Sequence, residues 1–299
     1  MLLNFIERTQ PIIQRIFAIA LLVIFVSSCG SSRSVENRIL RADSIIHASK
    51  FKPIQLKTPY FALYSVYHFP QPKDLLTVYI EGDGRSWVSR FQLSSDPTPI
   101  NPLALRLAVV HAQQSPNSNI AWLARPCQYQ PNKNDINCEP KYWSSHRFSE
   151  PIIDSTNNAI NQLMQKSGTT KVRLIGFSGG AAVAVLVAAR RDDVAELITL
   201  AGNLDHRWVN RYHEVTQLSG SLNAIDVASK LSATPQLHFI GQKDEVIPSQ
   251  VVTRFIDKIG TDLCVKKVLV DATHSKGWVE KWQDLLTAYV PLLCFMNES

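Results

Sequence analysis

The chain has 299 residues, of which 45% are hydrophobic, so it is long enough to bury a sizeable core in one large domain or two small ones. Its formal net charge is +6, but Lys and Arg are scattered along the chain and form no run with interleaved aromatic residues. This distribution argues against nucleic acid as a partner. A weak attraction to anionic membranes, or no role at all, fits the charge equally well.

The N-terminus has the features of an export signal. Arg8 and Arg15 precede an uninterrupted apolar run over residues 16–26, which is too short to span a membrane comfortably and ends in Ser27-Ser28-Cys29-Gly30. The cysteine after small residues resembles a bacterial lipobox, although Val26 replaces the usual leucine and Glu7 dilutes the positive charge. We expect a signal peptide over residues 1–28 and a lipid anchor on Cys29. An uncleaved N-terminal anchor is the alternative.

The location follows from the residue after the cysteine. In the lipoproteins that this segment resembles, an aspartate there tends to hold the protein at the inner membrane, and this chain has glycine. The sequence therefore predicts a membrane-attached protein of the bacterial cell envelope, in the outer membrane and facing the periplasm. Residues 29–50 are polar with a short helical pattern, which predicts a tether outside the core of a domain over residues 51–299.

Four cysteines remain after Cys29, and an even number in an exported chain indicates disulfides. Four cysteines allow three pairings, among which we favour Cys127 with Cys138 and Cys264 with Cys294. The chain has no CxxC motif and no clustered Cys and His, so no structural metal is expected.

From about residue 51 the chain alternates β-rich apolar runs with helical patterns, which predicts one α/β domain with a mostly parallel sheet covered by helices on both faces. Strands are expected at Tyr60–Tyr67, Leu75–Ile80, Asn119–Leu123, Val172–Gly176, Leu197–Leu200, Leu237–Ile240 and Val265–Val270, and helices at Pro102–Gln113, Glu150–Lys166, Gly179–Arg190 and Gly277–Leu293. Two further segments interrupt this alternation. An aromatic loop over residues 128–149 and an insertion over residues 203–231 are predicted to form the walls of a pocket.

A glycine-rich motif lies between a predicted strand and a predicted helix. Gly176-Phe177-Ser178-Gly179-Gly180 matches the G-x-S-x-G pattern, which in this setting forms a sharp turn that projects the serine Oγ at a helix N-terminus. The alternative is a glycine-rich turn whose serine only caps the helix. The preceding buried strand favours Ser178 as a nucleophile.

A nucleophilic serine needs a base, and the base needs a hydrogen-bond acceptor. Asp244 follows the predicted strand that ends at Ile240, and His274 follows the one that ends at Val270. Glu245 could replace Asp244 as the acid, and Asp271 could be a cap or loop residue. In the order Ser, Asp, His, these residues resemble the catalytic triad of the α/β-hydrolase superfamily, and the order of strands and helices resembles that fold over nearly all of the chain after Phe51.

The resemblance implies an oxyanion hole made of two backbone N–H groups. One is expected from Gly179, directly after the nucleophile. The other is expected from Asp83, because Glu81-Gly82-Asp83-Gly84 resembles the oxyanion turn of lipases and esterases with Glu81 in place of histidine. The replacement departs from the family pattern, and a simple turn is the alternative.

Three other histidines lie near these loops. His206 and His213, close to Asp205, have the residue types of a metal site, but their spacing is more typical of solvated side chains. His146 in the aromatic loop could touch a substrate, although a packing or surface role is the more common one.

The resemblance implies a serine hydrolase that needs no cofactor and works through an acyl-enzyme on Ser178. The expected substrate is a small-molecule or lipid-like carboxylic ester. A peptidase or amidase with the same triad is one alternative, and a binding lipoprotein that has kept the scaffold without catalysis is another.

Overall fold

The computed structural model describes residues 35–130, 137–260 and 264–290. Eight strands form its central sheet in the order β1-β2-β6-β3-β7-β8-β9-β10. The strands are β1 Lys52–Lys57, β2 Ala62–His68, β3 Leu75–Ile80, β6 Asn119–Leu123, β7 Lys171–Phe177, β8 Val194–Leu200, β9 Gln236–Gly241 and β10 Val265–Val270. The strands β1, β2 and β6 pair antiparallel, and from β6 to β10 every neighbouring pair is parallel. The predicted mostly parallel sheet is confirmed.

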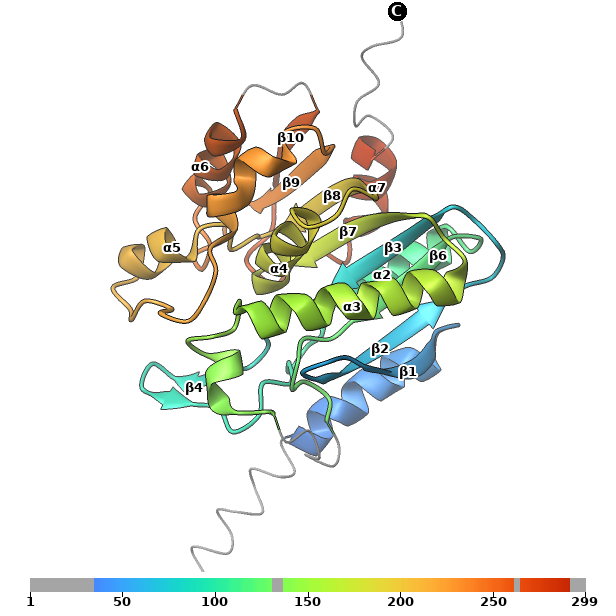
Figure 1. The fold of residues 1–299 in the computed structure, drawn as a ribbon, viewed down its shortest axis with the longest axis horizontal. Helices are drawn as coiled ribbons and strands as arrows, with labels where there is room; N and C mark the ends of the chain where they lie inside the picture. Colours follow the sequence, from blue (N-terminus) through green and yellow to red (C-terminus); the bar gives the residue numbers. More distant parts are fainter. Residues whose placement is uncertain (1–34, 131–136, 261–263, 291–299) are drawn as a thin grey trace, which may run out of the picture.

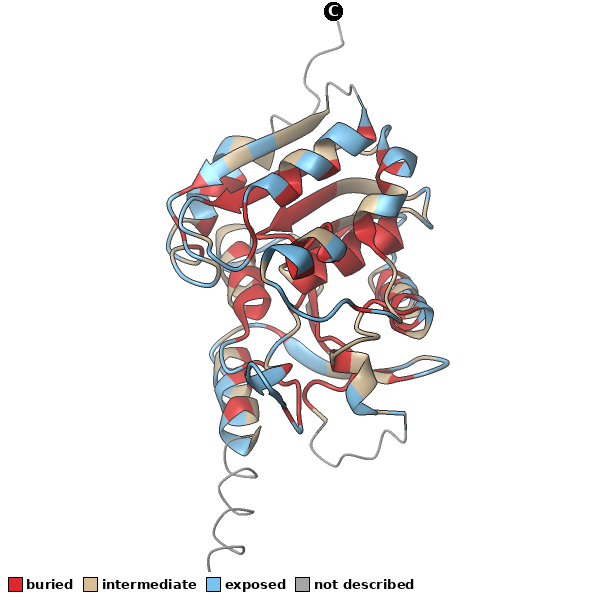
Figure 2. Ribbon diagram, turned by 90° about the vertical axis from the view of Figure 1, so that its left-hand side faces the viewer, coloured by how far each residue is buried: buried red, intermediate tan, exposed pale blue. Residues whose placement is uncertain are grey.

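Helices cover both faces of this sheet (Figure 1). One face carries α3 Glu150–Ser167, α4 Gly179–Ala188, α6 Gln250–Ile259 and the 3-10 helix η2 Ala224–Leu231; the other carries α2 Leu103–Gln114, α7 Trp282–Tyr289 and a helix over residues 35–47. Alternate residues of β3 enter the two cores, since Val78 and Ile80 pack with α3 and α4 while Tyr79 packs with α2 and α7. Because both faces are covered, the inner strands of the sheet are mostly buried (Figure 2), and β3 and β6 consist mainly of apolar residues.

The first described helix corrects the expected domain boundary. Residues 35–47 were predicted to belong to a tether outside the core, but Ala42 and Ile46 are buried in the cluster that contains α2. Arg38 is also buried, and its guanidinium donates 2.6 Å to the carbonyl oxygen of Thr98. The sequence did indicate a short helix here, but most of its residues are polar. The few apolar residues on one face, which pack on the core, were therefore not recognised as a buried face.

Several elements connect the strands at the edge where β3, β7 and β9 end. A two-stranded hairpin, β4 Trp87–Ser89 and β5 Gln92–Leu93, follows β3 and was not predicted. The insertion after β8 begins with α5 His206–Tyr212 and ends with η2, and the aromatic loop contains the 3-10 helix η1 Pro140–Trp143.

The last helix starts later than predicted. We expected it from Gly277, but α7 begins at Trp282 because residues 271–281 form turns. Gly277 has a φ of +86°, and the Trp278 indole N–H donates 2.9 Å to the carbonyl oxygen of Thr273. These turns use the residues that would otherwise have formed the first turn of the helix.

The predicted disulfide between Cys127 and Cys138 is confirmed, with 5.4 Å between the two Cα atoms. The second predicted bond cannot be compared with the structure, because Cys294 lies outside the described residues. The same holds for the signal peptide and for Cys29. None of the helices in the described ranges is long and apolar enough to cross a membrane.

Candidate active site

Ser178 lies in a strained turn between β7 and α4. Its backbone has a φ of +53° and a ψ of −118°, a conformation that residues with a side chain rarely adopt. The flanking glycines allow this turn to pack tightly, since a Cβ atom on Gly176 would lie 2.5 Å from the Cα of Ala181, and one on Gly180 would lie 2.4 Å from the carbonyl oxygen of Ile80. The turn therefore has the geometry of a nucleophile elbow.

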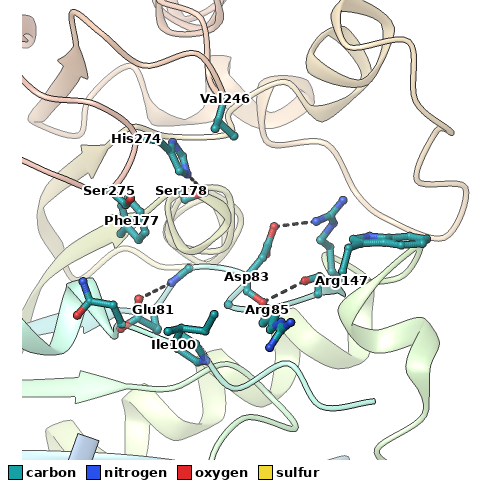
Figure 3. A pocket seen from close by; sticks show the side chains of 16 residues that line it. Glu81, Asp83, Arg85, Ile100, Arg147, Phe177, Ser178, Val246, His274 and Ser275 are labelled. Atoms are coloured by element: carbon teal, nitrogen blue, oxygen red, sulfur yellow. Dashed lines mark hydrogen bonds and ion pairs between the residues drawn. The ribbon is translucent and has the colours of Figure 1, made fainter. Parts of the chain in front are cut away.

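The structure brings Ser178, His274 and Asp244 together in one hydrogen-bonded series, of which Figure 3 shows the contact between Ser178 and His274. His274 Nε2 lies 3.0 Å from Ser178 Oγ, and His274 Nδ1 lies 2.9 Å from Asp244 Oδ2. The three residues follow β7, β10 and β9, whose carboxyl ends meet at the same edge of the sheet. A serine, an imidazole and a carboxylate in this order can activate the serine hydroxyl for attack on a carbonyl carbon.

Asp244 is held by its own loop. Its Oδ1 accepts hydrogen bonds from the backbone N–H groups of Val246 and Ile247, at 2.8 and 2.9 Å, and its side chain is 0% exposed. The alternatives are placed differently: Glu245 is exposed, and Asp271 forms an exposed ion pair of 2.6 Å with Lys243. Of these three carboxylates, Asp244 alone contacts His274 within the described residues.

The loop after β3 contains a buried carboxylate that stabilises the local backbone. Glu81 is 1% exposed and accepts four hydrogen bonds, from the backbone N–H groups of Gly82, Ala104 and Leu105 and from the indole of Trp122. Ala104 and Leu105 lie in the first turn of α2, so the carboxylate satisfies N–H groups that a helix N-terminus leaves free. Burial raises the pKa of Glu81 to about 7, although the four donors favour the ionised form.

Asp83, two residues further on, pairs with two arginines. Its Oδ1 lies 3.0 Å from Arg125 Nη1, and its Oδ2 lies 3.0 Å from Arg147 Nη1. Arg125 is 5% exposed, and its other terminal nitrogen donates to the carbonyl oxygen of Arg147. Burial lowers the pKa of Arg125, whereas the charge of Asp83 raises it. No sequence pattern indicated these contacts, because the partners lie 42 and 64 residues away.

The two predicted oxyanion donors lie on segments that touch. A Cβ atom on Gly179 would lie 2.0 Å from Asp83 Oδ1, so the loop after β3 packs directly on the start of α4. The N–H of Gly82 is already used by Glu81, and neither the N–H of Asp83 nor that of Gly179 donates to another described residue. Both groups are therefore available to a ligand beside Ser178, as expected for an oxyanion hole.

A pocket of about 540 Å³ opens above Ser178 and His274. Its polar lining includes Arg85 and Arg147, and its apolar lining includes Trp87, Ile100, Phe177 and Val246 (Figure 3). A second pocket of about 530 Å³ shares Trp87 and Arg147 with the first and lies against the aromatic loop and the insertion, at residues 144–147 and 210–218. The aromatic loop contributes Arg147 to the pocket of Ser178, whereas the insertion lines only the second pocket; the hairpin β4–β5 and Arg85 were not predicted to line either.

The three other histidines considered in the sequence do not line the pocket of Ser178. His206 Nε2 lies 3.1 Å from the carbonyl oxygen of Leu222, and His213 Nε2 lies 2.8 Å from that of Val246. His146 packs against Gly220, since a Cβ atom there would lie 2.2 Å from the His146 ring. The structure shows no group of three or more His, Cys, Asp or Glu side chains that could hold a metal ion among the described residues.

Comparison with known sequences agrees with this geometry. A sequence model of the family described as Serine hydrolase (FSH1) matches residues 105–275, which is more than half of the chain and includes Ser178 and His274. No curated protein matches the chain.

Solved structures share the fold. The esterase Pf2001 of Pyrococcus furiosus has a TM-score of 0.60 at 12% identity, with 82% of this chain and 93% of that chain covered. An alpha-beta serine hydrolase homologue from Coxiella burnetii has a TM-score of 0.52 at 16% identity, with 79% and 95% covered. Est1E from Butyrivibrio proteoclasticus has a TM-score of 0.56 at 13% identity, with 81% and 98% covered. The architecture is therefore that of the α/β-hydrolase fold, as predicted.

Proposed function

Because the chain belongs to the serine hydrolase (FSH1) family, we propose that it hydrolyses carboxylic esters through an acyl-enzyme on Ser178. The observation that carries this proposal is the series of hydrogen bonds from Ser178 through His274 to the buried Asp244. Two of the solved structures that share the fold are esterases, which supports an ester as the first substrate to test.

In the first step, Ser178 Oγ forms a bond to the ester carbonyl carbon while its proton moves to His274 Nε2. Asp244 holds the imidazole in the tautomer that can accept this proton and stabilises the imidazolium that results. The carbonyl oxygen becomes an oxyanion, which receives hydrogen bonds from the N–H groups of Gly179 and Asp83.

The tetrahedral intermediate then collapses. The bond from the carbonyl carbon to the alcohol oxygen breaks, and His274 gives its proton to the leaving alkoxide. In the second half, a water molecule loses a proton to His274 and attacks the acyl carbon, after which the proton returns to Ser178 and the carboxylic acid leaves.

Labelling with a fluorophosphonate tests the nucleophile, and hydrolysis of 4-nitrophenyl butyrate tests the reaction. We expect mass spectrometry to locate the adduct on Ser178, rather than on Ser86 or Ser275 of the same pocket. Ser178→Ala and His274→Ala should both lose labelling and hydrolysis while keeping a native circular dichroism spectrum. A folded wild-type protein that neither reacts with the probe nor cleaves the ester would overturn the proposal and favour a binding role.

The substrate class is tested in the same assay. The matched anilide, 4′-nitrobutyranilide, should be cleaved far more slowly than the ester, because an amide carbonyl is less electrophilic than an ester carbonyl and the amine is the poorer leaving group. Faster cleavage of the anilide would favour the peptidase or amidase alternative.

We also propose that the mature chain begins at Cys29, which carries the lipid anchor, and that it faces the periplasm from the outer membrane. The support is the sequence of residues 16–30. Metabolic incorporation of labelled palmitate that is lost in Cys29→Ser, together with outer-membrane fractionation, tests this placement.

A further inference from the structure

The charges that line the pocket of Ser178 are unevenly balanced. Its two carboxylates are both used within the protein, because Glu81 accepts four N–H donors and Asp83 pairs with Arg125 and Arg147. Arg85 also lines the pocket and is half-buried. Among the described residues its guanidinium has no ion pair and no hydrogen bond.

The surroundings of Arg85 add a second positive charge. Burial lowers the pKa of Arg38, the charge of Asp96 raises it, and the charge of Arg85 lowers it, so the guanidinium groups of Arg38 and Arg85 are near each other. The nearby carboxylate of Asp96 already lies 3.9 Å from Arg38 and accepts the backbone N–H of Thr98. Asp96 therefore does not neutralise both arginines, and a half-buried cation remains at the pocket wall. Such a local imbalance is typical of a site that receives a charged ligand.

The position of Arg85 relates this charge to the reaction. Arg85 follows the loop whose Asp83 N–H is assigned to the oxyanion hole, and its own backbone N–H donates 3.0 Å to the carbonyl oxygen of Pro97. Figure 3 draws Arg85 and Ile100 on the side of the pocket opposite His274 and Val246. A ligand bound to Ser178 thus meets a cation and an exposed apolar side chain on the same wall, since Ile100 is 50% exposed.

We infer that Arg85 is a specificity-determining residue that binds an anionic group of the substrate, so that the preferred substrates are esters carrying a carboxylate or a phosphate in addition to an apolar part. This inference rests on the proposed ester hydrolysis. The guanidinium forms a bidentate, charge-assisted pair with the anion, while Ile100 and Phe177 contact the hydrocarbon. The anion can belong to the acyl part or to the alcohol part of the ester.

Two matched pairs of substrates separate these cases. The first compares mono-4-nitrophenyl glutarate, whose acyl part is anionic, with neutral 4-nitrophenyl pentanoate. The second compares 4-(butyryloxy)benzoate, whose alcohol part is anionic, with neutral 4-(butyryloxy)benzamide. We expect kcat/KM for the anionic ester to exceed that of its neutral partner by about tenfold or more in at least one pair, the size of effect that one charge-assisted hydrogen bond gives.

The variants locate the effect on one side chain. Arg85→Gln should bring the ratio of kcat/KM for the anionic ester to that for its neutral partner down to about one. Arg85→Lys should keep part of the preference, and Arg85→Glu should reverse it. Arg211→Gln is the matched control, because Arg211 is exposed on α5 and removing it changes the net charge equally. It should keep the full preference.

Three results would count against the inference. Hydrolysis of the neutral esters with no preference in either pair overturns it and leaves the proposed function standing. A preference that survives in Arg85→Gln also overturns it, since another group would then bind the anion. If no ester of either kind is hydrolysed, the proposed function fails and this inference fails with it.

Discussion

The loops after β3 and β7 touch each other beside Ser178, yet they are held by different interactions. The loop after β7 is specified mainly by its own sequence, because glycines allow the strained turn and the helix α4 continues directly from it; backbone hydrogen bonds of Ser178 with Leu200 and Asn203 then attach it to the neighbouring strand end. The loop after β3 is fixed by side chains from distant parts of the chain, namely the arginines that pair with Asp83 and the helix α2 that binds Glu81. The comparison shows that one active site can combine a turn specified by local sequence with a turn that depends on tertiary contacts.

The largest expected effect is on the catalytic residues around Ser178, through the contact between Asp244 and His274. In Asp244→Asn, the amide oxygen can still accept the N–H groups of Val246 and Ile247, so the amide nitrogen faces His274 Nδ1. An N–H donor there favours the tautomer with its proton on Nε2, which cannot accept a proton from Ser178. We expect kcat to fall by about 10⁴-fold with little loss of stability. Glu245→Gln is the control, and a loss in Asp244→Asn no larger than in that variant would contradict the role of Asp244.

The next prediction addresses the contact between the two loops. In Gly179→Ala, the new methyl group would meet the carboxylate of Asp83, so one of the segments must shift and the two oxyanion donors lose their alignment. We expect kcat to fall by about 10²-fold or more, as when one donor is lost.

A double-mutant cycle sharpens this point. In an Asp83→Ala background the carboxylate is gone, so adding Gly179→Ala should lower kcat by much less than it does in the wild type. Losses that simply add would show that the clash with Asp83 is not the cause.

A smaller effect is expected for the ion pairs of the β3 loop. Asp83→Asn removes the negative charge that pairs with Arg125 and Arg147, and it leaves the buried Arg125 without a counter-charge at this position. We therefore expect the free energy of unfolding, measured in urea, to fall by about 3 kcal/mol. Asp226→Asn removes an exposed ion pair with Arg207 and should change it by less than about 1 kcal/mol. Equal changes in the two variants would mean that the β3 loop does not depend on this cluster.

The last prediction is a dependence of stability on pH, which is at most about as large as the effect of Asp83→Asn. The pKa of Glu81 is raised to about 7 in the folded protein from an ordinary value of 4.5, so the folded state keeps a proton that the unfolded state has lost. This contribution to stability is fully present below about pH 4.5 and is lost as the pH rises through about 7. It amounts to about 3 kcal/mol at most, by 1.36 kcal/mol per pKa unit.

Urea titrations between pH 5 and pH 8, on wild type and on Glu81→Gln, measure this contribution. In the variant, the free energy of unfolding should no longer show the decrease with rising pH that the titration of Glu81 causes in the wild type. The variant should also be less stable than the wild type over the whole pH range. The four N–H donors are shared between both carboxylate oxygens of Glu81, and a glutamine side chain has only one oxygen to accept them. An unchanged slope would show that Glu81 does not titrate in this range.

The sequence by itself determined the parts of the protein that depend on neighbouring residues. Continuous apolar runs predicted the parallel strands, because a strand covered on both faces has no polar side. The glycines around Ser178 predicted the strained turn, and the strand ends before Asp244 and His274 predicted which edge of the sheet they share. The short loop between Cys127 and Cys138 made their disulfide the simplest pairing.

Tertiary structure alone decided the rest. The helix over residues 35–47 joins the core through a few apolar residues whose partners are far along the chain. The four donors to Glu81, the two arginines on Asp83 and the placement of Arg85 in the pocket depend on which loops the sheet brings together. A charged residue has the same sequence pattern whether it is solvated or paired, so only its neighbours in space distinguish a surface side chain from one that shapes the site.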